Sequence, residues 1–263
     1  MPAKYPAVGM VSVVHLDHEV KLSGGNTTDV VRIGQTVHRN TGPWSKAVAR
    51  LLNTLEEASV QGVPRHLGFD EQGREVLTFI DGAVAQYPLP NWLWDDQILV
   101  DAAKLMRRIH DASVGVAQQR ELIWRLPVHE PREVVCHNDF APYNLVFQNK
   151  QLTGVIDFDA SSPGPRIWDL AYLAYRLVPF CEDDGAATPD DSQRLHRLGV
   201  LLRAYGEDSS YPNLLRVMSN RLLELADWTD MQAAASHNQA LESDAAMYIR
   251  DADKVTGFAE ALA

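Results

Sequence analysis

The segment of residues 137–157 constrains this chain more than any other part of its sequence. It combines a polar loop, an apolar hairpin and a carboxylate that follows the second hairpin strand. Asp139 and Asn144 stand in the spacing Asp-x4-Asn within the loop, and Asp157 comes after the hairpin. Phosphoryl transfer to a hydroxyl needs one carboxylate beside that hydroxyl, and an amide and a second carboxylate on the metal ion that bridges the phosphates. The three residues therefore predict a phosphoryl-transfer site with Mg²⁺, because hard oxygen ligands suit that ion.

Two other interpretations of these residues are weaker. Asp and Asn often cap turns in polar loops, which would make Asp139 and Asn144 purely structural. The strands on both sides and the matched position of Asp157 argue against this. A metal-dependent hydrolase could use His137, Asp139, Asp157 and Asp159 together, but the nine histidines of the chain include no second pair at ligand spacing.

The pattern resembles the aminoglycoside phosphotransferase and choline kinase superfamily. There the loop reads His-x-Asp-x4-Asn, as residues 137–144 do, and the metal carboxylate lies in an Ile-Asp-aromatic segment, as in Ile156-Asp157-Phe158. The resemblance is strongest over residues 134–173 and extends more weakly back to about Leu22. It implies an α+β, protein-kinase-like fold of two lobes, with a small antiparallel sheet and one helix in the N-terminal lobe and a mostly helical C-terminal lobe.

Hydrophobic patterning supports this layout. Alternation predicts three short strands between Val20 and Arg39, and the spacing of apolar residues over 48–55 predicts an amphipathic helix. A hairpin is expected over residues 66–80, a helix around residues 98–109, and three or four further helices beyond Arg166. We expect a nucleotide-binding lobe at residues 1–80, a hinge and connector at 81–92, and a lobe with the catalytic loop and acceptor site at 93–263.

The resemblance implies a role for each polar residue of the loop. Asp139 is the expected catalytic base, which orients the acceptor hydroxyl, while Asn144 and Asp157 are the expected Mg²⁺ ligands. His137 resembles the family histidine that braces the loop by hydrogen bonds. Asp169, in the segment Trp-Asp-Leu-Ala, resembles an aspartate that anchors the loop.

The expected nucleotide site lies in the N-terminal lobe. The turn of Ser23, Gly24, Gly25 and Asn26 falls where a phosphate-covering loop belongs, although such a turn is more often a plain hairpin turn. Phe79 and Ile80 fall where a hinge backbone would bind a purine. Arg39 stands where the family has a phosphate-binding lysine, and the following helix offers no glutamate to pair with it, since Glu56 and Glu57 lie near its far end. An exposed strand arginine is the alternative interpretation of Arg39.

The acceptor is expected to bind in the acidic C-terminal part. Residues 1–80 hold 8 Lys/Arg and 8 Asp/Glu, and the rest of the chain holds 16 and 27, so the whole net charge of −11 lies beyond residue 80. An acidic, aromatic wall would attract a cationic acceptor, although solubility alone also explains such charge. Tyr143, Asp159 and Trp228 are candidate wall residues, with Asp230 and a loop at residues 182–191. Asp159 either supports the metal ligands, binds a second ion or stabilises the loop.

These features predict a Mg²⁺-dependent small-molecule kinase. It would transfer the γ-phosphate of ATP or GTP to a hydroxyl of a small, cationic acceptor such as an aminoglycoside-like compound. The missing lysine–glutamate pair leaves open a nucleotide-binding pseudokinase that acts through protein contacts. A nucleotidyl transferase on the same fold is a third possibility.

Composition limits the expected cellular location and partners of the protein. No apolar run reaches the length of a membrane span, and charged residues directly follow the short apolar patch at residues 8–14, which disfavours a signal peptide. Two distant cysteines, Cys136 and Cys181, fit a reduced cytoplasm. The negative charge disfavours nucleic acid as a partner, and no obligate protein partner is evident.

Overall fold

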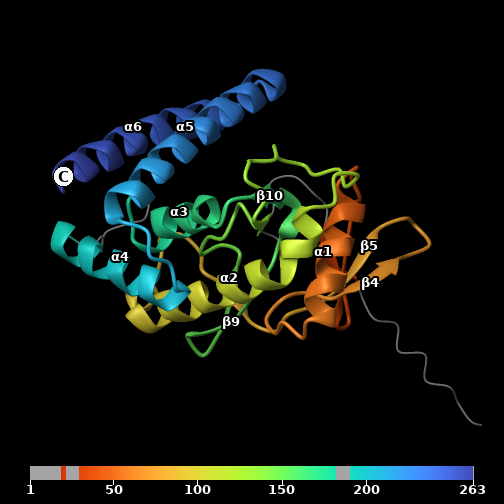
Figure 1. Ribbon diagram of the computed structural model, residues 1–263. Helices are drawn as coiled ribbons and strands as arrows, with labels where there is room; N and C mark the ends of the chain where they lie inside the picture. The colour runs from red at the N-terminus through yellow and green to blue at the C-terminus, as the bar shows by residue number, and fades with distance from the viewer. Residues whose placement is uncertain (1–18, 22–29, 182–189, 263) are drawn as a thin grey trace, which may run out of the picture.

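The computed structural model describes residues 19–21, 30–181 and 190–262. The expected phosphate-covering turn at residues 23–26, and most of the expected loop at residues 182–191, lie outside the described residues. Figure 1 shows a sheet with one helix at one end of the molecule and a body of helices at the other. This division confirms the predicted α+β, kinase-like arrangement.

Within the part of the chain that the structure describes, five antiparallel strands form the N-terminal sheet in the order β1-β2-β3-β5-β4. The strands are β1 (Val20–Lys21), β2 (Val30–Ile33), β3 (Thr36–Arg39), β4 (His66–Phe69) and β5 (Glu75–Thr78). The helix α1 (Ser45–Glu57) follows β3. It buries the predicted apolar stripe of Val48, Leu51, Leu52 and Leu55, because those positions fall on one face of a helix.

The C-terminal part is built around α2 (Asp96–Ala117), which begins where the Asp95 side chain accepts the N–H of Gln97. Four helices follow residue 165 among the described residues, in agreement with the three or four expected: α3 (Arg166–Leu177), α4 (Asp191–Tyr205), α5 (Tyr211–Ser236) and α6 (Gln239–Glu260). The helices α5 and α6 pack against each other as a hairpin, which lies above α3 in Figure 1. No helix among the described residues is long and apolar enough to cross a membrane.

Two antiparallel strand pairs hold the ends of the catalytic loop (residues 137–144). β7 (Val134–Cys136) leads into the loop, and β8 (Leu145–Gln148) leaves it and pairs with β9 (Gln151–Val155). Leu145 lies opposite Val155, and the N–H of Ile156 donates to the carbonyl of Asn144 at 2.9 Å. The register therefore brings the segment after β9, which carries Asp157, next to the end of the loop.

Several short elements were not predicted. β10 (Ser162–Gly164) pairs with β7, and β6 (Ala83–Val84) pairs with β8, so the segment after the N-terminal sheet already joins the C-terminal part. Two short 3-10 helices, η1 (Asn91–Trp94) and η2 (Phe158–Ala160), complete the fold. A Ser-Pro-Gly run has little strand propensity, because proline cannot donate to a ladder. The lobe boundaries at residues 80 and 92 stay a prediction.

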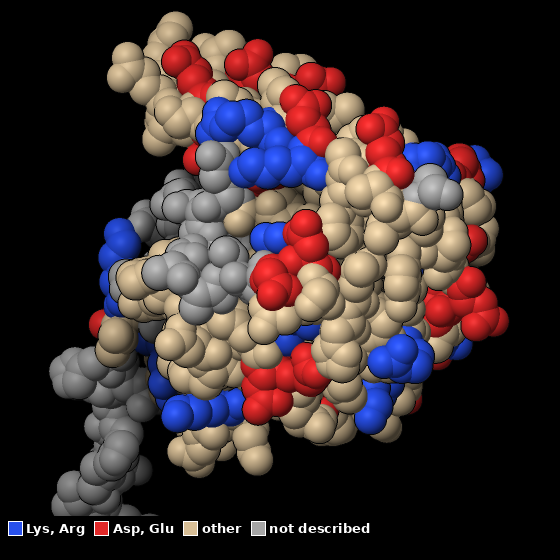
Figure 2. Space-filling view, turned by 90° about the vertical axis from the view of Figure 1, so that its left-hand side faces the viewer, with Lys and Arg blue, Asp and Glu red and all other residues tan. Residues whose placement is uncertain are grey.

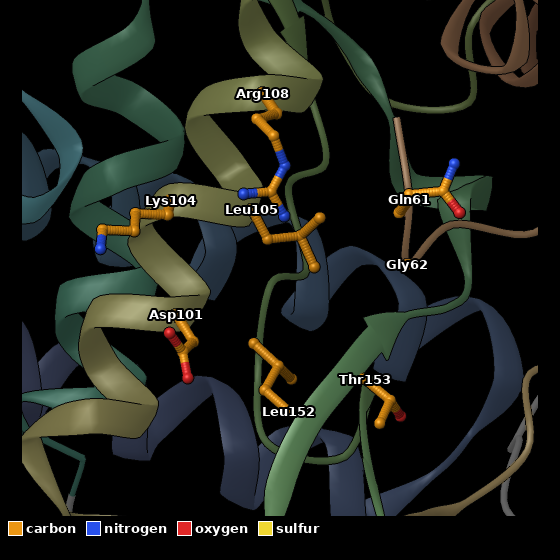
Figure 3. Close-up of a pocket in the computed structure, with 8 residues that line it drawn as sticks. All are labelled: Gln61, Gly62, Asp101, Lys104, Leu105, Arg108, Leu152 and Thr153. Carbon is orange, nitrogen blue, oxygen red and sulfur yellow. The ribbon is translucent and has the colours of Figure 1, made fainter. Parts of the chain in front are cut away.

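Two glycines bring the segment after α1 against β9. Gly62 has a φ of 84°, and its carbonyl accepts the N–H of Val155 at 2.8 Å. A Cβ on Gly154 would lie 2.6 Å from that carbonyl oxygen, so only glycine fits there. A pocket of about 290 Å³ opens beside this contact, with α2 on its other side (Figure 3). Its lining includes the exposed Lys104 and Arg108 and no residue of the catalytic loop.

Candidate active site

Asp169, in the first turn of α3, anchors the backbone of the catalytic loop. Its Oδ2 accepts the N–H of His137 and its Oδ1 accepts the N–H of Asn138, both at 2.8 Å. Asn138 has a φ of 65°, a left-handed conformation that costs a non-glycine residue of order 1–3 kcal/mol. The two bonds to Asp169 offset this strain and hold the turn just before Asp139.

The Asp169 carboxylate is buried and charged. Its Oδ2 lies 3.0 Å from Nε2 of His110, whose Nδ1 lies 2.7 Å from the Tyr205 hydroxyl. Burial raises the pKa of Asp169, but the hydrogen bond from His110 and the nearby charge of Arg221 lower it to about 2. His110, Cys136 and Asp169 lie close enough to hold a metal ion. Both His110 nitrogens are already hydrogen-bonded, so the cluster is better explained as the support of the loop.

His137 joins the catalytic loop to the strand that precedes Asp157. Its Nδ1 accepts the N–H of Asp139 at 3.2 Å, and its Nε2 donates to the carbonyl of Ile156 at 3.0 Å. An N–H donor at Nδ1 and a carbonyl at Nε2 fit the neutral ring with its proton on Nε2. Both nitrogens are thereby used within the protein. The geometry supports the bracing role that the resemblance implied and leaves no lone pair for a metal.

Asp139 and Asn144 share a hydrogen bond at the centre of the site. The Asn144 Nδ2 donates to Oδ2 and to the backbone carbonyl of Asp139, each at 2.9 Å. The hydroxyl of Tyr143 donates to Oδ1 of Asp139 at 2.5 Å. Burial raises the pKa of Asp139 above its ordinary value, against the lowering effect of the bonds from Tyr143 and Asn144. Because these bonds use the Asn144 nitrogen, its amide oxygen remains available to a ligand.

Asp157 lies next to this pair, directly after β9. Its side chain is 52% exposed and its backbone has a φ of 64°, a left-handed conformation that functional sites often hold. Burial, and then the negative charge of Asp157, raise the pKa of Asp139. The N–H of Ile156 donates to the carbonyl of Asn144 at 2.9 Å, which holds the segment with Asp157 beside the loop. One exposed carboxylate and one amide oxygen fit Mg²⁺, which usually keeps waters and phosphate oxygens as its other ligands. These residues therefore fit the metal that the resemblance implied.

Arg39 points into the site and is buried, so its interpretation as an exposed strand arginine was wrong. Its Nη2 lies 2.7 Å from Oδ1 of Asp159 and 2.8 Å from Oε2 of Glu75. Its Nη1 lies 3.6 Å from Oδ1 of Asp157. Burial lowers the pKa of Arg39, but the charges of these three carboxylates outweigh it and raise the pKa, so the guanidinium stays charged.

The acidic partner of Arg39 comes from a strand and not from the helix. Glu75 lies directly opposite Arg39 across the β3–β5 ladder and is fully buried. The Arg39 Nε donates to its Oε2 at 2.8 Å. Glu56 and Glu57 are exposed at the end of α1, and Glu56 lies 3.5 Å from Arg65 instead. The cross-strand pairing of residues 39 and 75 was the sequence signal that could have found this partner.

Asp159 connects the catalytic segment to the N-terminal sheet. Besides the ion pair with Arg39, it accepts a hydrogen bond from the indole of Trp44, the residue before α1. Burial raises the pKa of Asp159, and the Arg39 charge lowers it, with a net rise. These contacts favour a supporting role for Asp159 among the roles that the sequence left open.

The predicted nucleotide-binding residues are placed only in part. Phe79 follows β5, but its N–H already donates to the carbonyl of Gln35 at 2.9 Å, and the Arg32 guanidinium lies 3.6 Å from the centre of its ring. Its N–H is therefore engaged, and Ile80, half-buried at the next position, is the remaining predicted hinge residue. The turn of Ser23, Gly24, Gly25 and Asn26 lies outside the described residues.

Sequence reasoning missed Arg221, which holds the catalytic loop from α5. Its Nη2 donates to the carbonyl of Asn138 at 2.6 Å and its Nη1 to the Asn138 side-chain oxygen at 3.2 Å. The guanidinium also lies 4.7 Å from the ring centre of Tyr172. Arg221 is 83 positions from Asn138, and no motif marks it, because only helical character was evident in that region.

Tyr143, one of the candidate acceptor residues, lies beside Asp139 and next to a second tyrosine. The Tyr143 hydroxyl lies 3.1 Å from that of Tyr172, and the Arg176 guanidinium lies 5.7 Å from the Tyr143 ring centre. Figure 2 shows basic as well as acidic side chains around the hollow beneath the α5–α6 hairpin. Trp228 is half-buried on α5 and, among the described residues, makes no hydrogen bond or ring contact with the loop. The structure thus brings Tyr143 to Asp139 but does not bring Trp228 there.

Comparison with known proteins agrees with this geometry. The profile of the family described as "Phosphotransferase enzyme family" matches residues 37–211. The trifolitoxin immunity protein of Rhizobium leguminosarum bv. trifolii is 32% identical over 200 residues, which cover 73% of this chain and 75% of that protein.

Solved structures show the same fold at low identity. A choline/ethanolamine kinase family protein from Mesorhizobium loti has a TM-score of 0.62 at 17% identity, covering 95% of this chain and 93% of the other. A spectinomycin phosphotransferase in complex with ADP and spectinomycin has a TM-score of 0.60 at 13% identity, covering 93% and 92%. With two thirds of its length matched by the family profile, the chain belongs to the phosphotransferase enzyme family.

Proposed function

We propose that this protein is a Mg²⁺-dependent kinase that transfers the γ-phosphate of ATP or GTP to a hydroxyl of a small molecule. The observation that supports this proposal is the placement of Asp139, Asn144 and the segment that carries Asp157. Asp139 is hydrogen-bonded to Asn144 and to the Tyr143 hydroxyl, and the N–H of Ile156 donates to the carbonyl of Asn144 at 2.9 Å. That arrangement supplies an acceptor-orienting carboxylate and two metal ligands, the set that phosphoryl transfer requires.

In this mechanism Asp139 orients the acceptor hydroxyl and receives its proton. The acceptor oxygen forms a bond to the γ-phosphorus while the bond from that phosphorus to the bridging oxygen breaks, and the nucleoside diphosphate leaves. Mg²⁺, held by Asn144 and Asp157, would neutralise charge on the phosphates. Because the transition state is loose, the chief work of the protein is positioning.

Arg39 is the proposed replacement for the phosphate-binding lysine. Glu75 and Asp159 engage Nε and Nη2 of the guanidinium and fix its orientation, so Nη1, on the side of Asp157, is the nitrogen that would contact phosphate oxygens. The complex of the spectinomycin phosphotransferase with ADP supports a nucleotide in the corresponding fold. The proposed nucleotide site also includes the turn of Ser23, Gly24, Gly25 and Asn26 and the hinge residue Ile80. On this basis we assign residues 1–80 to the nucleotide-binding lobe.

The acceptor is proposed only as a class. Proteins with this fold include a choline/ethanolamine kinase family protein and a spectinomycin phosphotransferase. The similarity to the trifolitoxin immunity protein makes a toxin or an antibiotic a further candidate acceptor. The overall negative charge favours a cationic compound, while Arg176 and Arg221 beside the tyrosines argue for testing neutral and anionic compounds as well. A cytoplasmic location fits the two free cysteines.

The pseudokinase hypothesis loses its main support. It rested on the missing lysine–glutamate pair, and the buried Arg39–Glu75 pair offers an equivalent cation with a fixed counter-charge. Nucleotidyl transfer would leave a nucleotide adduct on a protein side chain. Mass spectrometry after incubation with Mg-ATP tests that outcome directly.

The test of the proposal is nucleotide consumption across a panel of hydroxylated amines, sugars, amino alcohols and antibiotics. Each hit is confirmed by a mass increase of one phosphoryl group on the acceptor. Asp139→Asn serves as the inactive variant and Asp253→Asn, an exposed change on α6, as the matched control. A confirmed acceptor that Asp139→Asn phosphorylates at the wild-type rate would contradict the role of Asp139.

A further inference from the structure

The hydroxyl of Tyr143 occupies the one oxygen of Asp139 that an acceptor needs. Asp139 has two carboxylate oxygens, and Oδ2 accepts the amide N–H of Asn144, the proposed metal ligand, at 2.9 Å. The other oxygen, Oδ1, accepts the Tyr143 hydroxyl at 2.5 Å. An acceptor hydroxyl must come within about 2.6–3.2 Å of its general base, so it has to approach Oδ1, where the phenol already lies.

The surroundings hold the phenol in this place. The Tyr172 hydroxyl lies 3.1 Å from the Tyr143 hydroxyl, which puts a second polar group directly behind the first. The ring of Tyr143 is half-buried and packs against the hydrophobic core. The residue directly precedes Asn144, whose N–H donates to the carbonyl of Ala141 at 2.8 Å, so a tight turn fixes the backbone. The contact with Asp139 is therefore built into the fold of the loop.

We propose that the phenol of Tyr143 is an internal occupant of the acceptor position. It holds the place of the acceptor oxygen on Asp139 in the resting site and keeps water away from that carboxylate. An acceptor must displace it before transfer can occur. This inference rests on the proposed function, because it assumes that Asp139 is the base. It makes Tyr143 a residue that favours transfer to the bound acceptor over wasteful hydrolysis of the nucleotide.

The proposal can be tested without knowing the acceptor. Nucleotide hydrolysis is measured with Mg-ATP and Mg-GTP alone, for wild type and for Tyr143→Ala, which opens the position to water. The expected result is hydrolysis at least tenfold faster in Tyr143→Ala. Asp253→Asn, the exposed change on α6, leaves the position filled and should hydrolyse at the wild-type rate. Adding Asp139→Asn to Tyr143→Ala should abolish the gain.

A second measurement separates this role from a merely structural one. Phenol has the ring and the hydroxyl that Tyr143→Ala removes and can enter the space left in that variant. It should either suppress the extra hydrolysis or become phosphorylated itself, since both results require a phenol at the acceptor position. If Tyr143→Ala melts far below wild type, nucleotide hydrolysis is measured instead on Tyr143→Leu, which removes the hydroxyl and keeps more of the buried volume.

The inference and the proposed function fail in different ways. If Tyr143→Ala binds Mg-nucleotide as wild type does but hydrolyses it no faster, and phenol has no effect, the inference is overturned and the kinase proposal stands. If wild type binds neither Mg-ATP nor Mg-GTP, the kinase proposal fails and takes the inference with it.

Discussion

Glu75→Gln should destabilise the protein and weaken its nucleotide site together. Glu75 is fully buried, accepts Nε of Arg39 at 2.8 Å and lies 2.8 Å from its Nη2. Removing one partner of a buried ion pair typically costs about 3–5 kcal/mol. Asp159 at 2.7 Å remains as a counter-charge, and glutamine keeps one acceptor oxygen. We therefore expect a loss near the lower limit, about 3 kcal/mol.

The loss can be measured as a change in the free energy of unfolding and in Tm. For a protein of this size, about 3 kcal/mol corresponds to a fall in Tm of roughly 6–12 °C. The affinity for Mg-ATP should fall at least tenfold, because the guanidinium loses the group that aims it. Glu71→Gln, an exposed change in the turn between β4 and β5, is the matched control and should stay within about 0.5 kcal/mol of wild type.

The reasoning fails if Glu75→Gln unfolds like wild type and binds nucleotide as well. In that case the cross-strand pair neither stabilises the lobe nor orients Arg39. A variant that is destabilised but binds nucleotide normally would refute only the second half of the argument, because Asp159 alone would then suffice to position the guanidinium.

Three further predictions concern the catalytic loop. Asp139→Asn should lower phosphoryl transfer at least about a hundredfold, with nucleotide affinity measured by calorimetry unchanged within threefold. Arg221→Ala removes the Arg221 hydrogen bonds to the carbonyl and the side-chain oxygen of Asn138. It should lower the free energy of unfolding in denaturant by about 3 kcal/mol. Arg216→Ala, exposed on the same helix, is the control and should lower it by less than about 0.5 kcal/mol. Asp169 has its pKa lowered to about 2 in the folded protein, so its ionised form stabilises the fold. This contribution to the free energy of unfolding is about 2 kcal/mol above about pH 4 and is lost as the pH falls from there toward 2. Unfolding in denaturant at several pH values checks this, and Asp169→Asn should lack that part of the pH dependence.

The parts of the fold that the sequence predicted are those set by local patterns. The helix stripe of α1 follows from a spacing of three and four residues, and the strands follow from alternation between turn residues. The loop with Asp139 and Asn144 was found because its chemistry fixes residue types at short, constant spacings. The register of β8 and β9 then brings Asp157 to the same place, as the sequence order suggested.

The partners that were missed depend on contacts between distant segments. Glu75 meets Arg39 only because β5 pairs with β3, whereas the resemblance directed attention to the helix. Arg221 reaches Asn138 from a helix that carries no motif. β10 is a Ser-Pro-Gly segment that forms a strand because β7 lies beside it, an outcome that local propensity opposes.

The most direct test of the central claim is the shift in Tm with Mg-ATP and Mg-GTP, measured on wild type, Asp157→Asn and the control Asp253→Asn. A ligand at 100 times its Kd stabilises by about 2.7 kcal/mol, which is easily resolved. The mechanism predicts a shift in wild type with at least one nucleotide that needs Mg²⁺, is lost in Asp157→Asn and is kept in the control. A shift of equal size in Asp157→Asn, or no shift in wild type with either nucleotide, would contradict a Mg-nucleotide site at Asn144 and Asp157.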